Sequence, residues 1–349
     1  MNPHSYSCTN KNCTLYEQVE NNQLVIHSQQ ENRLKCTCCN KTFSIRKGTG
    51  FYRLRYDQKI ITQVMTLLAF GCPAQAIVST FGIDYRTLDR WAERFGTTSR
   101  SLHKCLCFSI FDNVHIQADE LYQKLRGKGK AWIATALDVT SRMWLGVEVK
   151  RSRNRLLIKW LLEHVKHTLA EKASVFMETD GLSSYVSQAQ LVFRSKITNK
   201  GRWRWQVWQN LVVVQVVKTY SKTLAFTGLN KIKLGIGSWK QVGDFARKWK
   251  TNLINTAYVE RHNATLRGQL NHLVRKSRNL KEKLEFIKGF LWFKLAVYNY
   301  ATYHRSLSVD RKKKTPGMKA GVTNKKLSIK DILHFNVYTK NITYFDIHD

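Results

Sequence analysis

Residues 114–119 read Val-His-Ile-Gln-Ala-Asp, and the alternation of apolar and polar side chains in this stretch decides the fold. Such alternation predicts a β-strand with one buried face. Two further strands are predicted at residues 131–138 and 143–150. An amphipathic helix at 154–170 and a short buried strand at 174–177 follow. The order of three strands, a helix and a strand predicts an α/β core in which neighbouring strand ends meet at one edge of a sheet.

Three acidic side chains stand out in this core because the chain around them is cationic. Asp119 ends the first predicted strand, and Asp180 follows the strand at 174–177. Residues 181–243 contain no Asp or Glu, and Glu260 then lies at the start of a further predicted helix. Hard cations such as Mg²⁺ prefer carboxylate oxygens as ligands. We therefore expect Asp119, Asp180 and Glu260 to hold Mg²⁺ or Mn²⁺.

Each acid also has an ordinary structural explanation. Asp119 could cap a strand end, Asp180 could belong to a turn, and Glu260 could complement its helix dipole. Asp138 is the main rival for the first position, because it too ends a strand. Glu178 ranks lower, although it would share a strand face with Asp180. We prefer Asp119 since it follows the first strand of the core.

The chemistry that such a site permits is phosphoryl transfer. Two Mg²⁺ ions about 4 Å apart neutralise the attacking and leaving oxygens of an in-line displacement. Asp119 would bridge both ions, and Asp180 and Glu260 would each complete one. The protein would then contribute positioning and shielding, without a covalent nucleophile.

The composition favours a nucleic-acid partner. The 349 residues include 58 Lys and Arg against 24 Asp and Glu, for a net charge of +34, which favours a polyanion. Ten tryptophans and 43% hydrophobic residues argue against a packaging protein. The polar N-terminus has no signal-peptide core, and no apolar run approaches the roughly 20 residues that span a bilayer. We expect a cytoplasmic, nucleoid-associated protein without membrane contact.

Residues 1–50 predict a zinc ribbon. Cys8 and Cys13 form one close pair, and Cys36 and Cys39 form the second. Two such pairs joined by a strand-forming stretch are typical of a structural Zn²⁺ site with four cysteine ligands, and the metal replaces a core that ~50 residues could hardly build. Cys38 is predicted to be spare. The alternative is a set of unpaired buried or reactive thiols.

Residues 57–100 predict a helix-turn-helix domain, with helices at 58–70, 73–81 and 84–95. Polar residues at the start of the last helix lie where a recognition helix meets base edges. The alternative is a three-helix spacer without DNA contact. The candidate DNA-binding residues on this helix are Tyr85, Arg86, Thr87 and Arg90.

The stretch at 201–250 is predicted to be a β-rich insertion. Paired strands are expected at 212–217 and 223–226. Upstream of them, Trp203, Trp205 and Trp208 are interspersed with arginines. Aromatic residues in such a pattern could stack on unpaired bases. We favour the commoner arrangement, in which one strand face is core and the other is solvated.

The helix of Glu260 divides into an apolar and a polar stripe. Asn263, Arg267 and Asn271 share the polar stripe with Glu260, and we expect Asn263 and Arg267 to contact DNA. A long helix is predicted at 281–303, and a basic C-terminal segment follows at 308–349. The catalytic core is accordingly expected to occupy residues 112–307.

These residues resemble a family, the DDE transposases of bacterial and archaeal insertion sequences in which a zinc ribbon and a helix-turn-helix precede a ribonuclease-H-like integrase core. By resemblance, Asp119, Asp180 and Glu260 take the family's three carboxylate positions. Two departures are the long interval of 80 residues between Asp180 and Glu260, and His262 at an expected apolar position. The matching segments are Cys8–Cys13, Arg33–Ser44, Gln117–Leu121, Glu178–Gly181, Asn255–Asn263, Tyr298–Leu307 and Thr315–Met318.

The resemblance implies binding of terminal inverted repeats in double-stranded DNA, strand cleavage that exposes 3′-hydroxyls, and transfer into target DNA. Handling two ends in one complex implies a homodimer or a higher assembly. Two alternatives stay open. One is a non-enzymatic DNA-binding regulator, and the other is a ribonuclease-H-like nuclease specific for branched or hybrid substrates.

Overall fold

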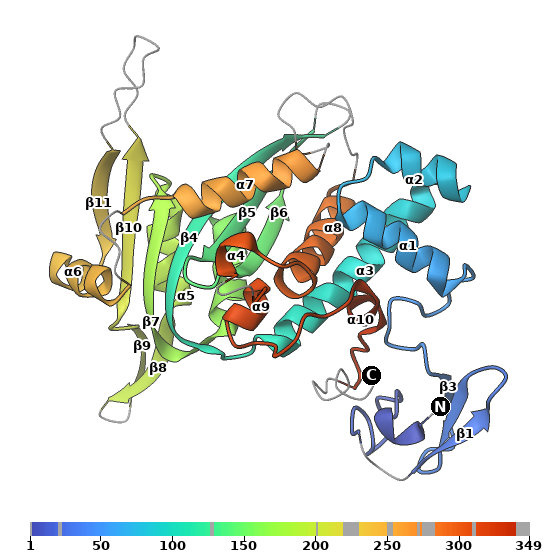
Figure 1. Cartoon of the computed structure of the whole chain (residues 1–349). Helices are drawn as coiled ribbons and strands as arrows, with labels where there is room; N and C mark the ends of the chain where they lie inside the picture. The colour runs from blue at the N-terminus through green and yellow to red at the C-terminus, as the bar shows by residue number, and fades with distance from the viewer. Residues whose placement is uncertain are drawn as a thin grey trace. The chain divides into compact units, whose positions relative to one another are not determined.

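The computed structural model describes residues 2–19, 23–125, 129–199, 202–218, 230–249, 254–270, 273, 283–308 and 312–339. The chain divides into two compact units (Figure 1). The chain leaves and re-enters each unit, and the four consecutive domains expected from the sequence stay a prediction. The first unit comprises Met1–Leu106, Gly289–Ala301 and Lys326–Asp349, and the second comprises Cys107–Lys288 and Thr302–Lys325.

The second unit is built on a six-stranded mixed sheet ordered β11-β10-β7-β4-β5-β6. β5 pairs antiparallel with both β4 and β6. β7 pairs parallel with β4 and with β10, and β11 forms the edge of the sheet antiparallel to β10. The predicted order of three strands, a helix and a strand is thus present. The strands are β4 (Phe111–Lys124), β5 (Lys130–Asp138), β6 (Trp144–Lys150), β7 (Leu169–Asp180), β10 (Leu211–Lys218) and β11 (Asn230–Ile236).

Helices α4 (Arg155–Thr168) and α5 (Ser183–Val192) pack together, and α4 covers β5 and β6. Gly146 on β6 permits this close packing, because a Cβ there would lie 2.9 Å from the Cβ of His164. The side chain of Glu148 is 1% exposed beneath α4, where it contacts His164 Nε2 at 3.2 Å and Lys288 Nζ at 2.7 Å. Burial opposes ionisation of Glu148, but these two partners lower its pKa to about 2.

The opposite face of the sheet carries α7 (Ala257–Gln269), which contacts β4 and β5. Helix α6 (Trp239–Lys248) covers the same face further along, where Phe176, Phe245 and Trp249 form a stacked aromatic cluster with Phe245 and Trp249 centroids 5.0 Å apart. Apolar packing therefore covers the sheet beneath α6, around Phe176.

A separate two-stranded hairpin, β8 (Arg194–Asn199) and β9 (Arg202–Val207), precedes β10. All residues of β9 are exposed, so the expectation of a core face is wrong for Trp203 and Trp205. The reason is that only the base of the ribbon packs on the body, at Ser195 of β8, whereas β9 is exposed along its length. Trp208 alone of the three tryptophans is buried. The antiparallel partner of β10 is β11. The partner strand predicted at 223–226 lies outside the described residues.

The first unit begins with a three-stranded antiparallel sheet of β1 (Leu24–Ser28), β2 (Arg33–Cys36) and β3 (Thr42–Ser44). A short 3₁₀ turn, η1 (Pro3–Ser5), precedes it. The four paired cysteines and Leu24, Leu34 and Phe43 form its small core. This core contains few apolar residues, which agrees with the expectation that a metal supplements it.

Three helices follow as predicted: α1 (Gln58–Ala69), α2 (Ala74–Phe81) and α3 (Tyr85–Leu106). Gly82, at φ 60°, ends α2 in the left-handed conformation that glycine tolerates. Helix α3 continues well past its predicted end near residue 95. Gly96 does not break it, because the backbone of Gly289 packs there and a Cβ on Gly96 would lie 2.0 Å from the Gly289 carbonyl oxygen.

The long helix predicted at 281–303 is present as α8 (Leu284–Ala296), continued by a π-helical turn, η3 (Val297–Ala301). Tyr300 in this turn is fully buried, and its hydroxyl lies 2.8 Å from His103 Nδ1 on α3. Short helices η4 (Arg305–Leu307), α9 (Pro316–Lys319) and α10 (Ile329–His334) complete the described chain. Among the described helices, none has the length and apolar character required to cross a membrane.

Candidate active site

The register between β4 and β7 places Asp119 beside Asp180. These strands are parallel, and Ala118 pairs with Thr179, so the next residue of each strand is an aspartate. Asp119, Glu120 and Asp180 each offer a carboxylate oxygen, and these three oxygens lie within 4.8 Å of one another. The structure thus brings together two of the acids selected from the sequence and adds Glu120.

Glu120 faces the opposite side of β4 and is held by Arg153. Arg153 Nε donates to Glu120 Oε2 at 2.8 Å, and its Nη2 donates to Asp180 Oδ2 at 2.7 Å. The Glu120 side chain is 1% exposed. Burial raises its pKa to about 7, and repulsion from Asp180 acts in the same direction. No pattern in the sequence marks Arg153, because the fold alone brings it to the acids.

Asp119 is fixed from the side of α7. Asn263 Nδ2 donates to Asp119 Oδ2 at 2.9 Å, and the other end of the Asn263 amide accepts from Thr135 Oγ1 at 3.2 Å. Burial raises the pKa of Asp119, and the nearby charges of Asp180 and Glu260 raise it further. A group whose neighbours disfavour its charge is one that a bound cation would stabilise.

Glu260 lies in the first turn of α7, with an exposed side chain that accepts from Thr256 Oγ1 at 2.6 Å. It lies outside the group of carboxylates within 4.8 Å, yet it is near enough to raise the pKa of Asp119. The structure therefore places Glu260 beside the cluster. Whether it completes a metal site stays a prediction.

Gln117 fastens the start of α7 to the sheet. Its Oε1 accepts from the backbone N–H groups of Tyr258 at 2.8 Å and Val259 at 3.1 Å. Its Nε2 donates to the Asn255 carbonyl at 2.8 Å and to Glu178 Oε2 at 2.7 Å. No side chain of α7 itself caps these N–H groups. A strand residue thus performs the capping that Ser, Thr, Asp or Asn normally provides, and this sets the position of Glu260.

The two rival acids have other contacts. Asp138 is 3% exposed and caps the turn after β5, where it accepts from Ser141 N at 2.7 Å. It pairs with Ile116, which precedes Asp119 by three residues on β4, so Asp138 lies outside the carboxylate cluster. Glu178 is fully buried and contacts Gln117 and His115 Nε2, the latter at 3.0 Å. Both acids are therefore engaged in structural hydrogen bonds.

The donor set of the cluster suits a hard divalent cation. Asp119, Glu120 and Asp180 contribute carboxylate oxygens only, and a single guanidinium, that of Arg153, contacts two of them. Mg²⁺ and Mn²⁺ take such oxygen ligands, commonly with one or two protein carboxylates and several waters. The residues present therefore fit a divalent cation on chemical grounds.

Cys8, Cys13, Cys36 and Cys39 come together as predicted, with their sulfurs all within 4.8 Å. Cys8 and Cys39 sulfurs are 3.7 Å apart, and Cys13 and Cys36 sulfurs 3.9 Å apart. A tetrahedron with Zn–S bonds of about 2.3 Å has edges of about 3.8 Å. The geometry therefore fits Zn²⁺. Cys38 is exposed, as expected of a spare residue.

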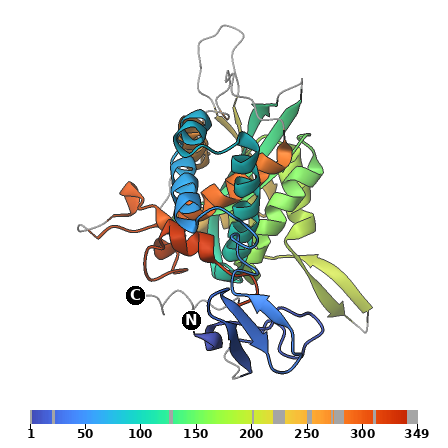
Figure 2. The same ribbon diagram turned by 90° about the vertical axis from the view of Figure 1, so that its right-hand side faces the viewer.

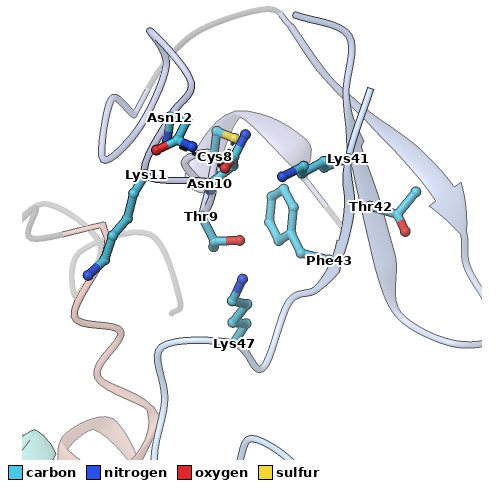
Figure 3. A pocket seen from close by; sticks show the side chains of 9 residues that line it. All are labelled: Cys8, Thr9, Asn10, Lys11, Asn12, Lys41, Thr42, Phe43 and Lys47. Carbon is cyan, nitrogen blue, oxygen red and sulfur yellow. Dashed lines mark hydrogen bonds between the residues drawn. The ribbon is translucent and has the colours of Figure 1, made fainter. Parts of the chain in front are cut away.

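Ionisation of one thiol is already favoured. Burial raises the pKa of Cys39, but hydrogen bonds from the Lys41 backbone and the Asn10 side chain outweigh it and lower the pKa to about 6. A metal-binding thiolate is therefore accessible at neutral pH. The hollow beside this cluster is lined by Lys11, Lys41 and Lys47 (Figure 3), which gives its rim a positive charge.

The start of α3 presents its polar residues as the sequence predicted. Tyr85, Arg86 and Arg90 are exposed and Thr87 is half-buried, whereas Leu88 and Trp91 are buried. A groove beside this turn is lined by Arg53, Arg55, Arg90 and Arg94 together with Thr87. Contact of these residues with DNA stays a prediction, and the four arginines supply the charge that it requires.

The remaining α7 residues are more buried than the two-stripe pattern implied. Asn263 is 1% exposed and holds Asp119, so its predicted contact with DNA stays untested. Arg267 is half-buried on the same helix, and Asn271 lies outside the described residues. His262 packs edge-on against Trp144, with centroids 4.6 Å apart. This contact explains a histidine where an apolar residue was expected.

Comparisons with known proteins add little. No family model matches the chain, and no curated protein matches it. Among solved structures, the chain is similar to the HTLV-2 integrase catalytic core domain in complex with magnesium (trimeric form), with a TM-score of 0.28 and 13% sequence identity over 61% of this chain and 99% of that chain. A likeness this weak does not establish fold or activity.

Proposed function

We propose that this chain is a DDE transposase, which binds the ends of an insertion sequence and performs metal-dependent DNA strand cleavage and strand transfer. The observation that carries the proposal is the convergence of Asp119 and Asp180 on neighbouring parallel strands. The strand order and directions of the sheet, with β4 central, support assignment to the ribonuclease-H-like fold. Glu260 on α7 is the proposed third carboxylate.

The chain's own residues would position the reaction. Asp119, Asp180 and Glu260 would hold Mg²⁺ or Mn²⁺, which neutralises charge on attacking and leaving oxygens when bound. Asn263 keeps the Asp119 carboxylate oriented. Gln117 keeps α7, and hence Glu260, against the sheet.

DNA binding would fall to the first unit. The exposed residues at the start of α3 would read the terminal repeats, and the zinc ribbon would support that binding. Because two ends must be processed together, we propose a homodimer or higher assembly on DNA. A net charge of +34 supports binding to the phosphate backbone.

The test is end-specific cleavage and joining with a labelled donor that carries the repeats flanking the gene. Asp119→Asn and Asp180→Asn should each lower the rate at least about a hundredfold, because each removes a ligand to charge-stabilising metal. Asp244→Asn is the matched control, since this exposed acid on α6 pairs with Arg247 at the surface. Equal rates for Asp180→Asn and Asp244→Asn would refute the proposal.

The same assay separates the third carboxylate and the alternatives. Glu260→Gln should abolish cleavage, whereas Glu120→Gln should leave measurable cleavage if Glu120 only anchors Arg153. A non-enzymatic regulator would bind the repeats without nicking them. A structure-specific nuclease would cut branched or hybrid substrates without joining strands.

A further inference from the structure

The β8–β9 hairpin exposes two tryptophans on β9, a strand whose residues are all exposed in the described part of the chain. Trp203 is 61% exposed and Trp205 is 50% exposed. Figure 2 shows the hairpin, coloured yellow-green, extending away from the six-stranded sheet. Large aromatic side chains that are exposed next to one another are typical of an interaction site.

The base of the hairpin is firmly anchored, so its exposure is built into the fold. Trp208 is 4% exposed, packs on Phe193 and donates from Nε1 to Ser195 Oγ at 2.9 Å. Lys166 on α4 donates to the carbonyls of Val192 at 2.8 Å and of Arg194 at 3.0 Å. The ribbon therefore leaves the body from a fixed point.

The pairing register sorts the side chains of the hairpin into two faces. Trp205 lies opposite Lys196, and Trp203 lies opposite Thr198. Diagonal neighbours on one face are within reach of long side chains. Accordingly, Arg194 Cζ lies 4.5 Å from the centre of the Trp205 ring, and Lys196 Nζ lies 4.5 Å from that of Trp203. One face is thus aromatic with cations beside the rings.

The opposite face is cationic. Because side chains alternate along a strand, Arg202 and Arg204 project away from the tryptophans, and both are exposed. Residues 181–243 contain no Asp or Glu, so no acid within this stretch neutralises these cations. A second copy of the chain would bring an equally cationic hairpin, which disfavours self-association through this surface.

We propose that the β8–β9 hairpin binds single-stranded nucleic acid, with Trp203 and Trp205 stacking on unpaired bases and the surrounding Arg and Lys side chains contacting phosphates. Stacked aromatics beside a basic groove are the physical basis of sequence-tolerant single-strand binding. Cations alone would accept any polyanion. The tryptophan rings require a free base face, which a fully paired duplex does not offer. That the bound strand is DNA exposed next to a cleavage site rests on the proposed function. The binding of a single strand by the hairpin does not.

The test compares binding of full-length protein to a labelled oligo-dT strand of about 16 nucleotides and to a blunt duplex of the same length. The main variant is Trp203→Val/Trp205→Val, because valine keeps strand propensity while removing the rings. Its affinity for the single strand should fall at least about tenfold, with little change for the duplex. The pair Trp203→Phe/Trp205→Phe should restore most of the binding. Trp239→Val, at an exposed tryptophan on α6, is the matched control.

The arginine variant tests the phosphate contacts. Arg202→Ala/Arg204→Ala should weaken binding and lower the slope of log affinity against log salt by about 1.4, since each phosphate contact in a single strand contributes about 0.7. An unchanged slope would contradict the assignment of these side chains.

Three outcomes overturn the proposal. The first is single-strand affinity of the valine pair equal to that of Trp239→Val. The second is an equal loss on single strand and duplex. The third is loss of binding to anionic phospholipid vesicles, or of self-association, with single-strand binding intact. Failure of the proposed function is distinguishable, because wild-type protein that binds single strands through the hairpin but cleaves no repeat-bearing donor would leave this inference standing.

Discussion

Replacing Gln117 tests whether one strand residue holds α7 in place. Gln117→Leu keeps the side-chain size but removes the two bonds accepted from α7 N–H groups and the two protons donated to Asn255 and to Glu178. Neutral hydrogen bonds contribute about 1 kcal/mol each, and one to a carboxylate about 2 kcal/mol. Allowing about 1 kcal/mol for the added apolar burial, the loss is about 4 kcal/mol.

Gln123→Leu is the matched control on the same strand. Gln123 is 3% exposed, and neither end of its amide has a hydrogen-bond partner among the described residues. Replacing an unsatisfied buried amide by an apolar group of similar shape should be neutral or stabilising. The two substitutions should therefore change the free energy of unfolding differently, although both replace a buried glutamine of β4 by leucine.

The assay is thermal unfolding combined with amide hydrogen exchange. For a unit of about 200 residues, 4 kcal/mol corresponds to a fall in Tm of roughly 10 °C. Exchange should accelerate first at Tyr258 and Val259, whose N–H groups lose their acceptor. If Gln117→Leu destabilised no more than Gln123→Leu, or if exchange at these two amides stayed unchanged, the capping role would be refuted.

Three further predictions concern the rest of the chain. Purified protein should contain one Zn²⁺ by elemental analysis, and Cys39→Ala should lose it while Cys38→Ala keeps it, because only the former thiol lies in the sulfur cluster. Glu148 has a folded pKa of about 2, below its unfolded value, so its stabilisation of about 3 kcal/mol is present above pH 4.5 and lost as pH falls toward 2; urea unfolding of wild type and Glu148→Gln should therefore converge in that window. Gly96→Ala should destabilise because its Cβ would meet the Gly289 backbone, whereas Gly243→Ala has open space and should stabilise by about 0.5–1 kcal/mol, as denaturant midpoints would measure.

The sequence predicted the strand order and the meeting of two acids, because those follow from local patterns. Alternation marks β4, and its parallel pairing with β7 brings Asp119 beside Asp180. The expectation that Asp119 ends its strand is wrong, because β4 continues to Lys124 through its pairing with β5. Gln117 and Arg153 could not be found in the same way. Their roles depend on which helix and which turn the fold brings to them, and nothing in their neighbouring residues encodes that contact.

The hairpin shows the opposite limit. Trp203 and Trp205 alternate with arginines as a half-buried strand does, so local pattern predicts a buried aromatic face. The ribbon instead projects from its anchor at Trp208, and the pattern carries no information about whether a second layer covers it. The full length of α3 is missed for a related reason, since the sequence does not show that Gly96 packs against Gly289.

The chain passes between its two units four times, after residues 106, 288, 301 and 325. This arrangement limits which truncations and gene fusions can give a folded product. A premature stop after the third helix would release a product carrying the zinc ribbon and the candidate recognition helix but lacking Gly289–Ala301, whose residues include the Tyr300 that contacts α3. Such a shortened product would lack part of the core of its unit, and we expect it to be poorly folded and short-lived. Exchange of either half between genes as an intact cassette is likewise disfavoured, because no single crossover separates the two.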